Sequence, residues 1–417
     1  MGIVLTKSLS CALLWAVCAV ALADDYADAR AELVTAYQAQ DYPAMVAAAQ
    51  LAVSARPSHP GARFNLALSH ALNGDADAAL AALDVLVASG IDFGVGEMAE
   101  FAILKELPGW DGYMQRVAAL NAPAGTAEVA HSLADSDFVP EGIALDQAGT
   151  VYLGSIRKGR LQRGAEVLSD RQGHWSVFGM RFHDDGSLWF ASAAVAQLED
   201  VGDDLGKTGL FRLDTKSGEV TRSAILPQLA DQQVLGDLVI AGDVIYATDS
   251  LTGAIYRYDI EPGTFSTLLE PGVMRSPQGL VLDQSGRYLY VADYTDGLYR
   301  VSIADGVAAR LELPGEIAID YGIDGLYRHG EQLIAIQNGI RPHRVTAFEL
   351  NDEGNGIVAS RILAASLRAF DEPTLGAVRG GSFYFVANSH WNRFDRENRL
   401  PEGLTGPVVL KLNLDYD

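Results

Sequence analysis

Two short polar segments gather the side chains best suited to bind a ligand. Residues 337–344 read Gln-Asn-Gly-Ile-Arg-Pro-His-Arg, and residues 388–392 read Asn-Ser-His-Trp-Asn. Each follows an apolar, strand-like run, so each is expected to be a loop at a strand end, where binding groups commonly lie. Their cationic, imidazole and aromatic groups predict binding of an anionic or sugar-like substrate. The predicted substrate-binding residues are Asn338, Arg341, His343, Asn388 and His390.

Several common kinds of catalytic chemistry are missing from the sequence. It contains no Gly-x-Ser-x-Gly segment, no His-Glu-x-x-His segment and no phosphate-binding loop. The two cysteines, Cys11 and Cys18, lie in a segment that is expected to be removed. We therefore expect no cysteine nucleophile, no thiolate metal site and no disulfide. The histidines that stand alone in the sequence favour structural roles: His131, His174, His183 and His329.

The first 23 residues have the pattern of a secretory signal peptide. Lys7 supplies a positive charge, residues 9–22 are apolar, and Ala21-Leu22-Ala23 forms a small-x-small cleavage site before Asp24. No later stretch is apolar for the length that a membrane helix needs. The sequence therefore predicts an exported protein, periplasmic or secreted, without a membrane span.

The charge balance is strongly acidic. The chain has 31 Lys and Arg against 54 Asp and Glu, a net charge of −23. Such a field repels phosphate backbones and favours cations near clustered carboxylates. A nucleic acid partner is therefore not expected.

Residues 24–125 are predicted to form a helical domain. Residues 26–56 are rich in alanine, with larger apolar residues at helical spacing and a break near residues 40–43. The layout returns 34 residues later, with Asp41 matched by Asp75 and Leu51 by Val85, which is typical of tetratricopeptide-like (TPR-like) hairpins. Residues 98–120 are expected to form a capping hairpin. Such repeats either present a groove to a peptide or protein partner or pack against the neighbouring domain.

Residues 126–417 are predicted to form a six-bladed β-propeller. A unit of short apolar strands and Asp/Gly-rich turns recurs six times, with opening positions at 141, 178, 236, 278, 324 and 374. Residues 128–133 are expected to pair with residues 408–412 and close the ring. The predicted fold class is thus mainly β, a six-bladed β-propeller preceded by an α-helical, TPR-like domain.

These units resemble the SMP-30/gluconolactonase/luciferin-regenerating family over residues 137–412. The resemblance rests on the strands and on the segments Pro140-Glu141-Gly142, Ser276-Pro277-Gln278-Gly279-Leu280 and Ile323-Asp324-Gly325-Leu326. It implies one divalent cation, calcium, at the mouth of the central channel, because oxygen ligands from several blades converge there. The implied ligands are Glu141, Asp324 and Gln278.

The chain departs from the family pattern at two of these positions. Gln278 stands where the family has asparagine; it keeps the amide carbonyl but is longer by one methylene, so either the metal shifts or the ligand folds back. Gly236 stands where the family has a substrate-binding asparagine, and Asp237 beside it is a possible substitute metal ligand. Without a cation, Glu141 and Asp324 would simply be solvated carboxylates at the channel mouth.

Two functions remain open from the sequence. The first is a calcium-dependent hydrolase of the lactonase or esterase kind, in which Asp324 is both a metal ligand and the base that activates water on a small sugar-like or lactone substrate. The second is a non-enzymatic binding or scaffold protein that holds partners on its helical repeats and propeller face.

Overall fold

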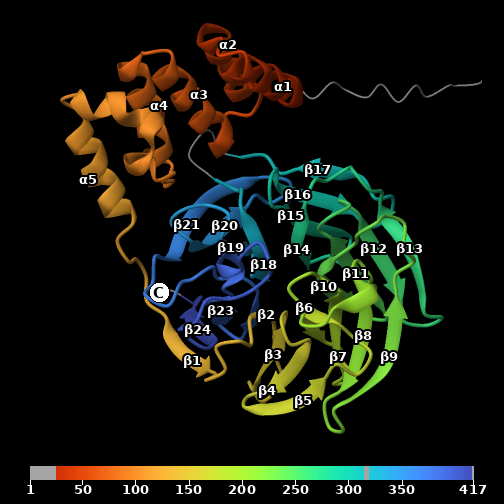
Figure 1. Ribbon diagram of the computed structural model, residues 1–417. Coiled ribbons are helices and arrows are strands. Elements are labelled where there is room, and N and C mark those ends of the chain that lie inside the picture. The colour runs from red at the N-terminus through yellow and green to blue at the C-terminus, as the bar shows by residue number, and fades with distance from the viewer. Residues whose placement is uncertain (1–24, 314–318, 416–417) are drawn as a thin grey trace, which may run out of the picture.

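The computed structural model describes residues 25–313 and 319–415, and shows a six-bladed β-propeller with helices beside its rim (Figure 1). Each blade is a four-stranded antiparallel sheet. The predicted fold class is confirmed, because six such sheets surround one central channel. The predicted signal peptide lies outside the described residues.

Five of the blades consist of four strands that are consecutive in the chain, with the first strand innermost. Blade 1 has β2 (Pro140–Leu145), β3 (Val151–Ser155), β4 (Arg160–Arg163) and β5 (Glu166–Asp170). Blade 2 has β6 (Ser176–Phe182), β7 (Leu188–Ala193), β8 (Thr208–Asp214) and β9 (Glu219–Ile225). Blade 3 has β10 (Leu235–Ala241), β11 (Val244–Asp249), β12 (Ile255–Asp259) and β13 (Thr264–Leu269). Blade 4 has β14 (Pro277–Leu282), β15 (Tyr288–Asp293), β16 (Gly297–Ser302) and β17 (Ala308–Arg310). Blade 5 has β18 (Ile323–His329), β19 (Gln332–Gln337), β20 (Arg344–Leu350) and β21 (Ile357–Ala365).

The sixth blade joins the two ends of the propeller sequence. It consists of β22 (Gly376–Arg379), β23 (Ser382–Val386), β24 (Val408–Asn413) and, as its outer strand, β1 (Glu128–Ser132). Glu128 pairs with Lys411 and Ser132 with Val408. The predicted closure is therefore confirmed, and it ties the first strand to the last blade so that the ring has no open end.

A β-bulge opens the innermost strand of blades 1 to 5. In each of them the strand register shifts near the start of the strand, as between Pro140 and Ile143 in β2. A bulge re-aims the side chains that it contains. The glycine in this position permits close contact with the next blade: a Cβ on Gly142 would lie 2.1 Å from Phe178 O, and a Cβ on Gly279 would lie 2.3 Å from Leu326 N. The bulges therefore turn one polar or aromatic side chain per blade toward the channel.

The helical domain contains two helical hairpins followed by an irregular third. The helices are α1 (Asp25–Gln38), α2 (Tyr42–Ala55), α3 (Pro60–Leu72), α4 (Ala76–Ala88) and α5 (Trp110–Leu120), with 3₁₀ turns η1 (Val95–Glu97) and η2 (Ala99–Glu106). Asp41 caps α2 by accepting from Ala44 N, and Asp75 caps α4 by accepting from Ala78 N. The caps recur at the predicted 34-residue spacing, while assignment to the tetratricopeptide class stays a prediction. None of the helices in the described ranges is long and apolar enough to cross a membrane.

The helical domain sits beside the mouth of the propeller rather than over its centre (Figure 1). Arg56 forms an ion pair with Asp296 at 2.7 Å, and the ring of His59 lies 4.6 Å from that of Tyr321. Two further contacts use backbone groups: Asp92 N donates to Arg341 O at 2.9 Å, and an Arg344 guanidinium N–H donates to Gly90 O at 2.9 Å. The helices are thus fixed to loops of blades 4 and 5.

Candidate functional site

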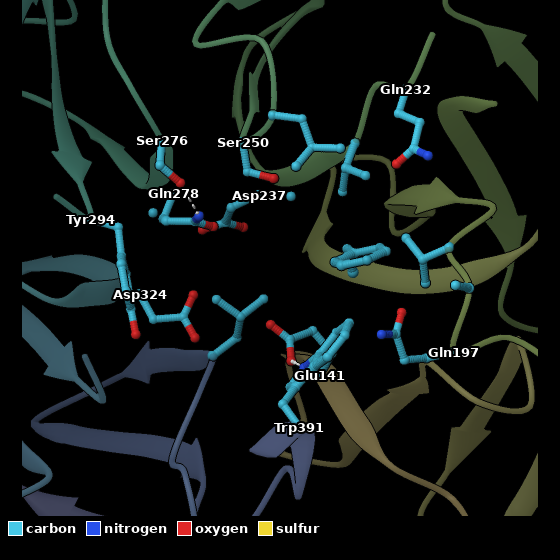
Figure 2. Close-up of a pocket in the computed structure, with 18 of the residues that line it drawn as sticks. Glu141, Gln197, Gln232, Asp237, Ser250, Ser276, Gln278, Tyr294, Asp324 and Trp391 are labelled. Carbon is cyan, nitrogen blue, oxygen red and sulfur yellow. Dashed lines mark hydrogen bonds between the residues drawn. The ribbon is translucent and has the colours of Figure 1, made fainter. Parts of the chain in front are cut away.

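One side chain from the start of each blade points to a common cavity at the channel mouth. The cavity has a volume of about 600 Å³. Glu141, Asp237, Gln278 and Asp324 all line it, from blades 1, 3, 4 and 5 (Figure 2). Blade 2 contributes Phe178 instead of a polar residue. The bulged strand starts therefore bring together residues that lie almost 200 positions apart.

Glu141 and Asp324 share one hydroxyl group. Thr374 Oγ1 lies 2.6 Å from Glu141 Oε1 and 2.8 Å from Asp324 Oδ2. Trp391 Nε1 donates to the other oxygen of Glu141 at 2.6 Å. A hydroxyl has a single proton, so Thr374 can donate to only one of the two carboxylates at a time. One of the two carboxylates is therefore left without a hydrogen-bond donor at this hydroxyl, and a bound proton or a cation would supply the missing positive charge.

The pKa values of both carboxyl groups also indicate that the pair lacks positive charge. Burial raises the pKa of Glu141 well above its usual range, and the charge of Asp324 raises it further. Burial also raises the pKa of Asp324 to about 6, against the lowering effect of its hydrogen bonds from Thr374 and Asn338. Two carboxyl groups in one poorly solvated site resist full ionisation unless a positive charge joins them.

Two amide side chains, Asn338 and Gln278, line the same cavity. Asn338 Nδ2 donates to Asp324 Oδ2 at 2.7 Å, while its buried Oδ1 has no hydrogen-bond partner. Gln278 Nε2 donates to Ser276 Oγ at 3.0 Å. A Cβ on Gly236 would lie 3.6 Å from Gln278 Oε1, so the longer side chain leans into the space beside this glycine. The two departures from the family pattern are thus neighbours in space.

Asp237 has a different environment from the other carboxylates. It is 1% exposed, and its Oδ2 lies 3.1 Å from a guanidinium nitrogen of Arg181. Its Oδ1 accepts from Leu238 N at 2.8 Å. The structure therefore commits both of its oxygens to protein groups, and places it on the cavity wall as half of an ion pair.

Apolar side chains form the opposite wall of the cavity. They come from β6, from the loops after β7 and β11, from the segment just before β10 and from the turn η4 (Trp391–Arg393). The main ones are Phe178, Val195, Val234, Leu251 and Trp391. The cavity therefore has a carboxylate side and an apolar side, which suits a ligand with one polar and one hydrocarbon end.

The five predicted substrate-binding residues separate into three places. Asn338 lines the cavity beside Asp324. Arg341 and His343 line a second cleft, between the propeller and the helices. Asn388 and His390 are each 2% exposed and line neither space; Asn388 bonds to Gly406 O and Val408 N, and His390 bonds to Asp371. Their positions and partners are those of residues that hold the last blade together.

Comparison with known proteins finds similar solved structures but no matching family. No protein-family model matches the chain, and neither does any curated protein sequence. Similar solved structures include a regucalcin, described as a calcium-binding protein, from Agrobacterium tumefaciens: 17% identity, 69% of this chain and 95% of that one, TM-score 0.47. A luciferin-regenerating enzyme has 11% identity, 70% and 95% coverage and a TM-score of 0.48. A chain of a nidogen–laminin complex has 14% identity, 66% and 98% coverage and a TM-score of 0.43.

The chain is a six-bladed propeller of the kind that the sequence resemblance implies.

Four residues of the site were not identified from the sequence. Thr374 and Trp391 bond to Glu141, while Tyr294 and Glu372 line the cavity. Burial raises the pKa of Glu372 to about 7, and its backbone has a φ of +61°, a strained value for a residue with a side chain. Two of them had a sequence signal: Thr374 opens the sixth repeat, where the other repeats place site residues, and Trp391 lies in the polar segment 388–392.

The oxygen atoms around Glu141 and Asp324 suit a hard divalent cation. In the described ranges no three carboxylate, imidazole or thiolate side chains are grouped closely enough to hold a metal ion. A cation here would depend on amide oxygens as well: Asn338 bonds to Asp324, and Gln278 lines the same cavity. Calcium accepts such mixed carboxylate, amide and water ligands.

Proposed function

We propose that this chain is a calcium-dependent hydrolase that cleaves a small ester or lactone at the mouth of the propeller. The observation that carries the proposal is the pair Glu141 and Asp324, which share the single proton of Thr374 while the buried Oδ1 of Asn338 has no partner. A divalent cation would balance both features. The residues that would hold it are Glu141, Asp324, Asn338 and Gln278, and Asp237 is set aside because Arg181 pairs with it.

When bound, the cation would polarise the substrate carbonyl and make a nearby water more acidic. Asp324 would accept the proton of that water. Its Oδ2 faces Asn338 Nδ2 and Thr374 Oγ1, whereas Oδ1 accepts no hydrogen bond from the described residues, so the proton would go to Oδ1. The water oxygen then bonds to the carbonyl carbon, the acyl–oxygen bond breaks, and the proton passes from Asp324 to the leaving oxygen.

Other side chains position the substrate and exclude water. Burial, together with the charges of Asp324 and Glu372, raises the pKa of Tyr294, so its hydroxyl stays neutral and can donate to a substrate oxygen. Trp391 fixes Glu141 through its indole N–H and adds to the apolar wall. The wall would receive the hydrocarbon part of the ester.

The proposal is tested by hydrolysis of a panel of lactones and aryl esters, with and without calcium. We expect activity that requires calcium and is lost in Asp324→Asn. We also expect calcium to raise the melting temperature of the wild-type protein and not of Asp324→Asn. A panel without any hydrolysis would refute the enzyme.

Binding of a protein partner is the second candidate. It is favoured by apolar side chains on α1 and α2 that are exposed at 44% for Val34, 52% for Tyr37 and 57% for Leu51. A melting temperature that does not respond to calcium, together with no hydrolysis, would favour this candidate.

We further propose that the protein is exported through its first 23 residues. Mass spectrometry of protein from its native host would then find Asp24 as the first residue. A retained Met1 would show that no export signal is cleaved.

A further inference from the structure

A cleft between the helical domain and the propeller adjoins the proposed active site. It has a volume of about 820 Å³ and is lined by α1, by the start of α3 and by loops of blades 4 and 5. Four residues line both this cleft and the channel-mouth cavity: Ser276, Tyr294, Asn338 and Glu372. One ligand can therefore extend from the cavity into the cleft.

The cleft gathers arginine side chains in a chain that is otherwise strongly acidic. Arg30 lines it from the helical domain, and Arg275 and Arg341 line it from the propeller. No carboxylate within the described ranges pairs with Arg30 or Arg341. Three guanidinium groups in one cleft stand out against the net charge of −23 of the whole sequence.

The carboxylates in the same cleft have other partners or are partly protonated. Asp296 is paired with Arg56 at 2.7 Å. Asp92 accepts from Asn121 Nδ2 at 2.8 Å and from Gly94 N at 2.7 Å. Glu372 has its pKa raised to about 7 by burial. Asp92 keeps its charge, because both of its donors are neutral. Arg30 and Arg341 therefore leave the cleft with only a small excess of positive charge, which suits a group with one negative charge.

Two histidines, His59 and His343, also line the cleft. Burial and the charges of three arginines lower the pKa of His59 to about 4. Burial and Arg341 lower the pKa of His343. Burial and cationic neighbours both favour the neutral imidazole, so neither histidine adds positive charge to the cleft.

The two walls of the cleft are held in place by direct contacts. The ring of His59 lies 4.8 Å from Tyr26 of the helical domain and 4.6 Å from Tyr321 of the propeller. The hydrogen bond from Asp92 N to Arg341 O fixes the loop that carries one of the arginines. A preformed site loses less entropy when its ligand binds.

We propose that this cleft binds the carboxylate of a substrate whose ester or lactone group lies in the channel-mouth cavity, so that the substrates are acidic esters. The inference takes the reacting group from the proposed function and adds the recognition of the anion. Guanidinium groups bind carboxylates in a bidentate manner, and a monoanion matches the small excess of charge better than a dianionic phosphate.

The test compares esters that differ only in the distant charge. The 4-nitrophenyl monoesters of adipic and suberic acids are assayed beside the mixed diesters in which the free carboxylate is a methyl ester. We expect the wild-type protein to show a KM roughly tenfold lower for at least one monoester than for its diester. That preference should disappear in Arg30→Gln/Arg341→Gln and persist in Arg361→Gln, a control on the exposed outer strand of blade 5. Equal KM values for monoester and diester in the wild-type protein would overturn the inference while leaving the hydrolase intact.

A binding measurement separates this inference from the proposed function. Calorimetry with adipate and suberate requires no turnover. We expect at least one diacid to bind the wild-type protein and Arg361→Gln alike, and to bind roughly tenfold more weakly in Arg30→Gln and in Arg341→Gln. If no ester is hydrolysed but a diacid binds in this pattern, the hydrolase is refuted and the anion site stands. If neither diacid binds, or if all variants bind equally, the anion site is refuted.

Discussion

Asp324→Asn tests whether the two carboxylates strain the cation-free protein. The substitution keeps the shape of the side chain and removes its charge. Because the pKa of Asp324 is raised to about 6, the folded state holds the proton more tightly than the unfolded chain does. The free energy of unfolding therefore falls as the pH rises from about 4 to about 6, and the penalty is complete above that range.

The size of the effect follows from the shift. Two pKa units correspond to about 3 kcal/mol, and the partial exposure of Asp324 in the cavity reduces this through solvent screening. We expect Asp324→Asn to be more stable than the wild-type protein by about 1 to 3 kcal/mol at pH 8 without divalent cations, and to gain much less at pH 4. Neutralising one carboxylate also relieves Glu141, which acts in the same direction.

The assay is urea-induced unfolding in the presence of a chelator at the two pH values, followed by tryptophan fluorescence. Asp352→Asn, at an exposed loop position, is the matched control and should change stability little at either pH. An Asp324→Asn variant that is no more stable at pH 8, or one that gains equally at pH 4, would refute the reasoning that like charges strain this site.

Three further predictions concern other parts of the molecule. Burial lowers the pKa of His174 to about 4, so wild-type stability should fall by up to about 3 kcal/mol from pH 6.5 to pH 4, and His174→Gln should flatten that fall in urea titrations. In calorimetry with calcium, Gln278→Asn should hold or tighten binding, whereas Glu141→Gln should weaken it by roughly tenfold or more; equal binding by all three proteins would move the cation elsewhere. A Cβ on Gly279 would lie 2.3 Å from Leu326 N, so Gly279→Ala should lower the free energy of unfolding by about 1 to 3 kcal/mol. The control Gly112→Ala, within α5, should stabilise the protein slightly, and thermal melting measures both effects.

Sequence patterns alone predict the fold class and the positions, one at the start of each repeat, that face the channel. Strand periodicity and the recurring Asp/Gly turns repeat six times, because each blade needs the same alternation to bury its faces against two neighbours. The repeat also aligned Glu141, Gln278 and Asp324 as the first polar residues of their blades. These positions meet because the ring closes through β1 and β24, as the sequence predicted.

The hydrogen-bond and ion-pair partners of these side chains come from distant parts of the chain and are known only from the tertiary structure. Asp237 looked like a substitute ligand, but Arg181 of the neighbouring blade lies 3.1 Å from it, and no local pattern encodes a contact across 56 residues. Asn388 and His390 had suitable chemistry, yet the last blade closes over them and satisfies their hydrogen bonds. Thr374 and Trp391 reach Glu141 from residues more than 230 positions away.

The sequence also does not predict where the helical domain lies relative to the propeller. The 34-residue repeat predicts how each helix packs on the next, because those contacts are local. The placement of the domain beside the mouth depends instead on a few specific contacts, such as Arg56 with Asp296 and His59 with Tyr321. Local sequence patterns determine periodic elements and their order, whereas contacts between distant surfaces depend on shapes and charges that exist only once both domains have folded.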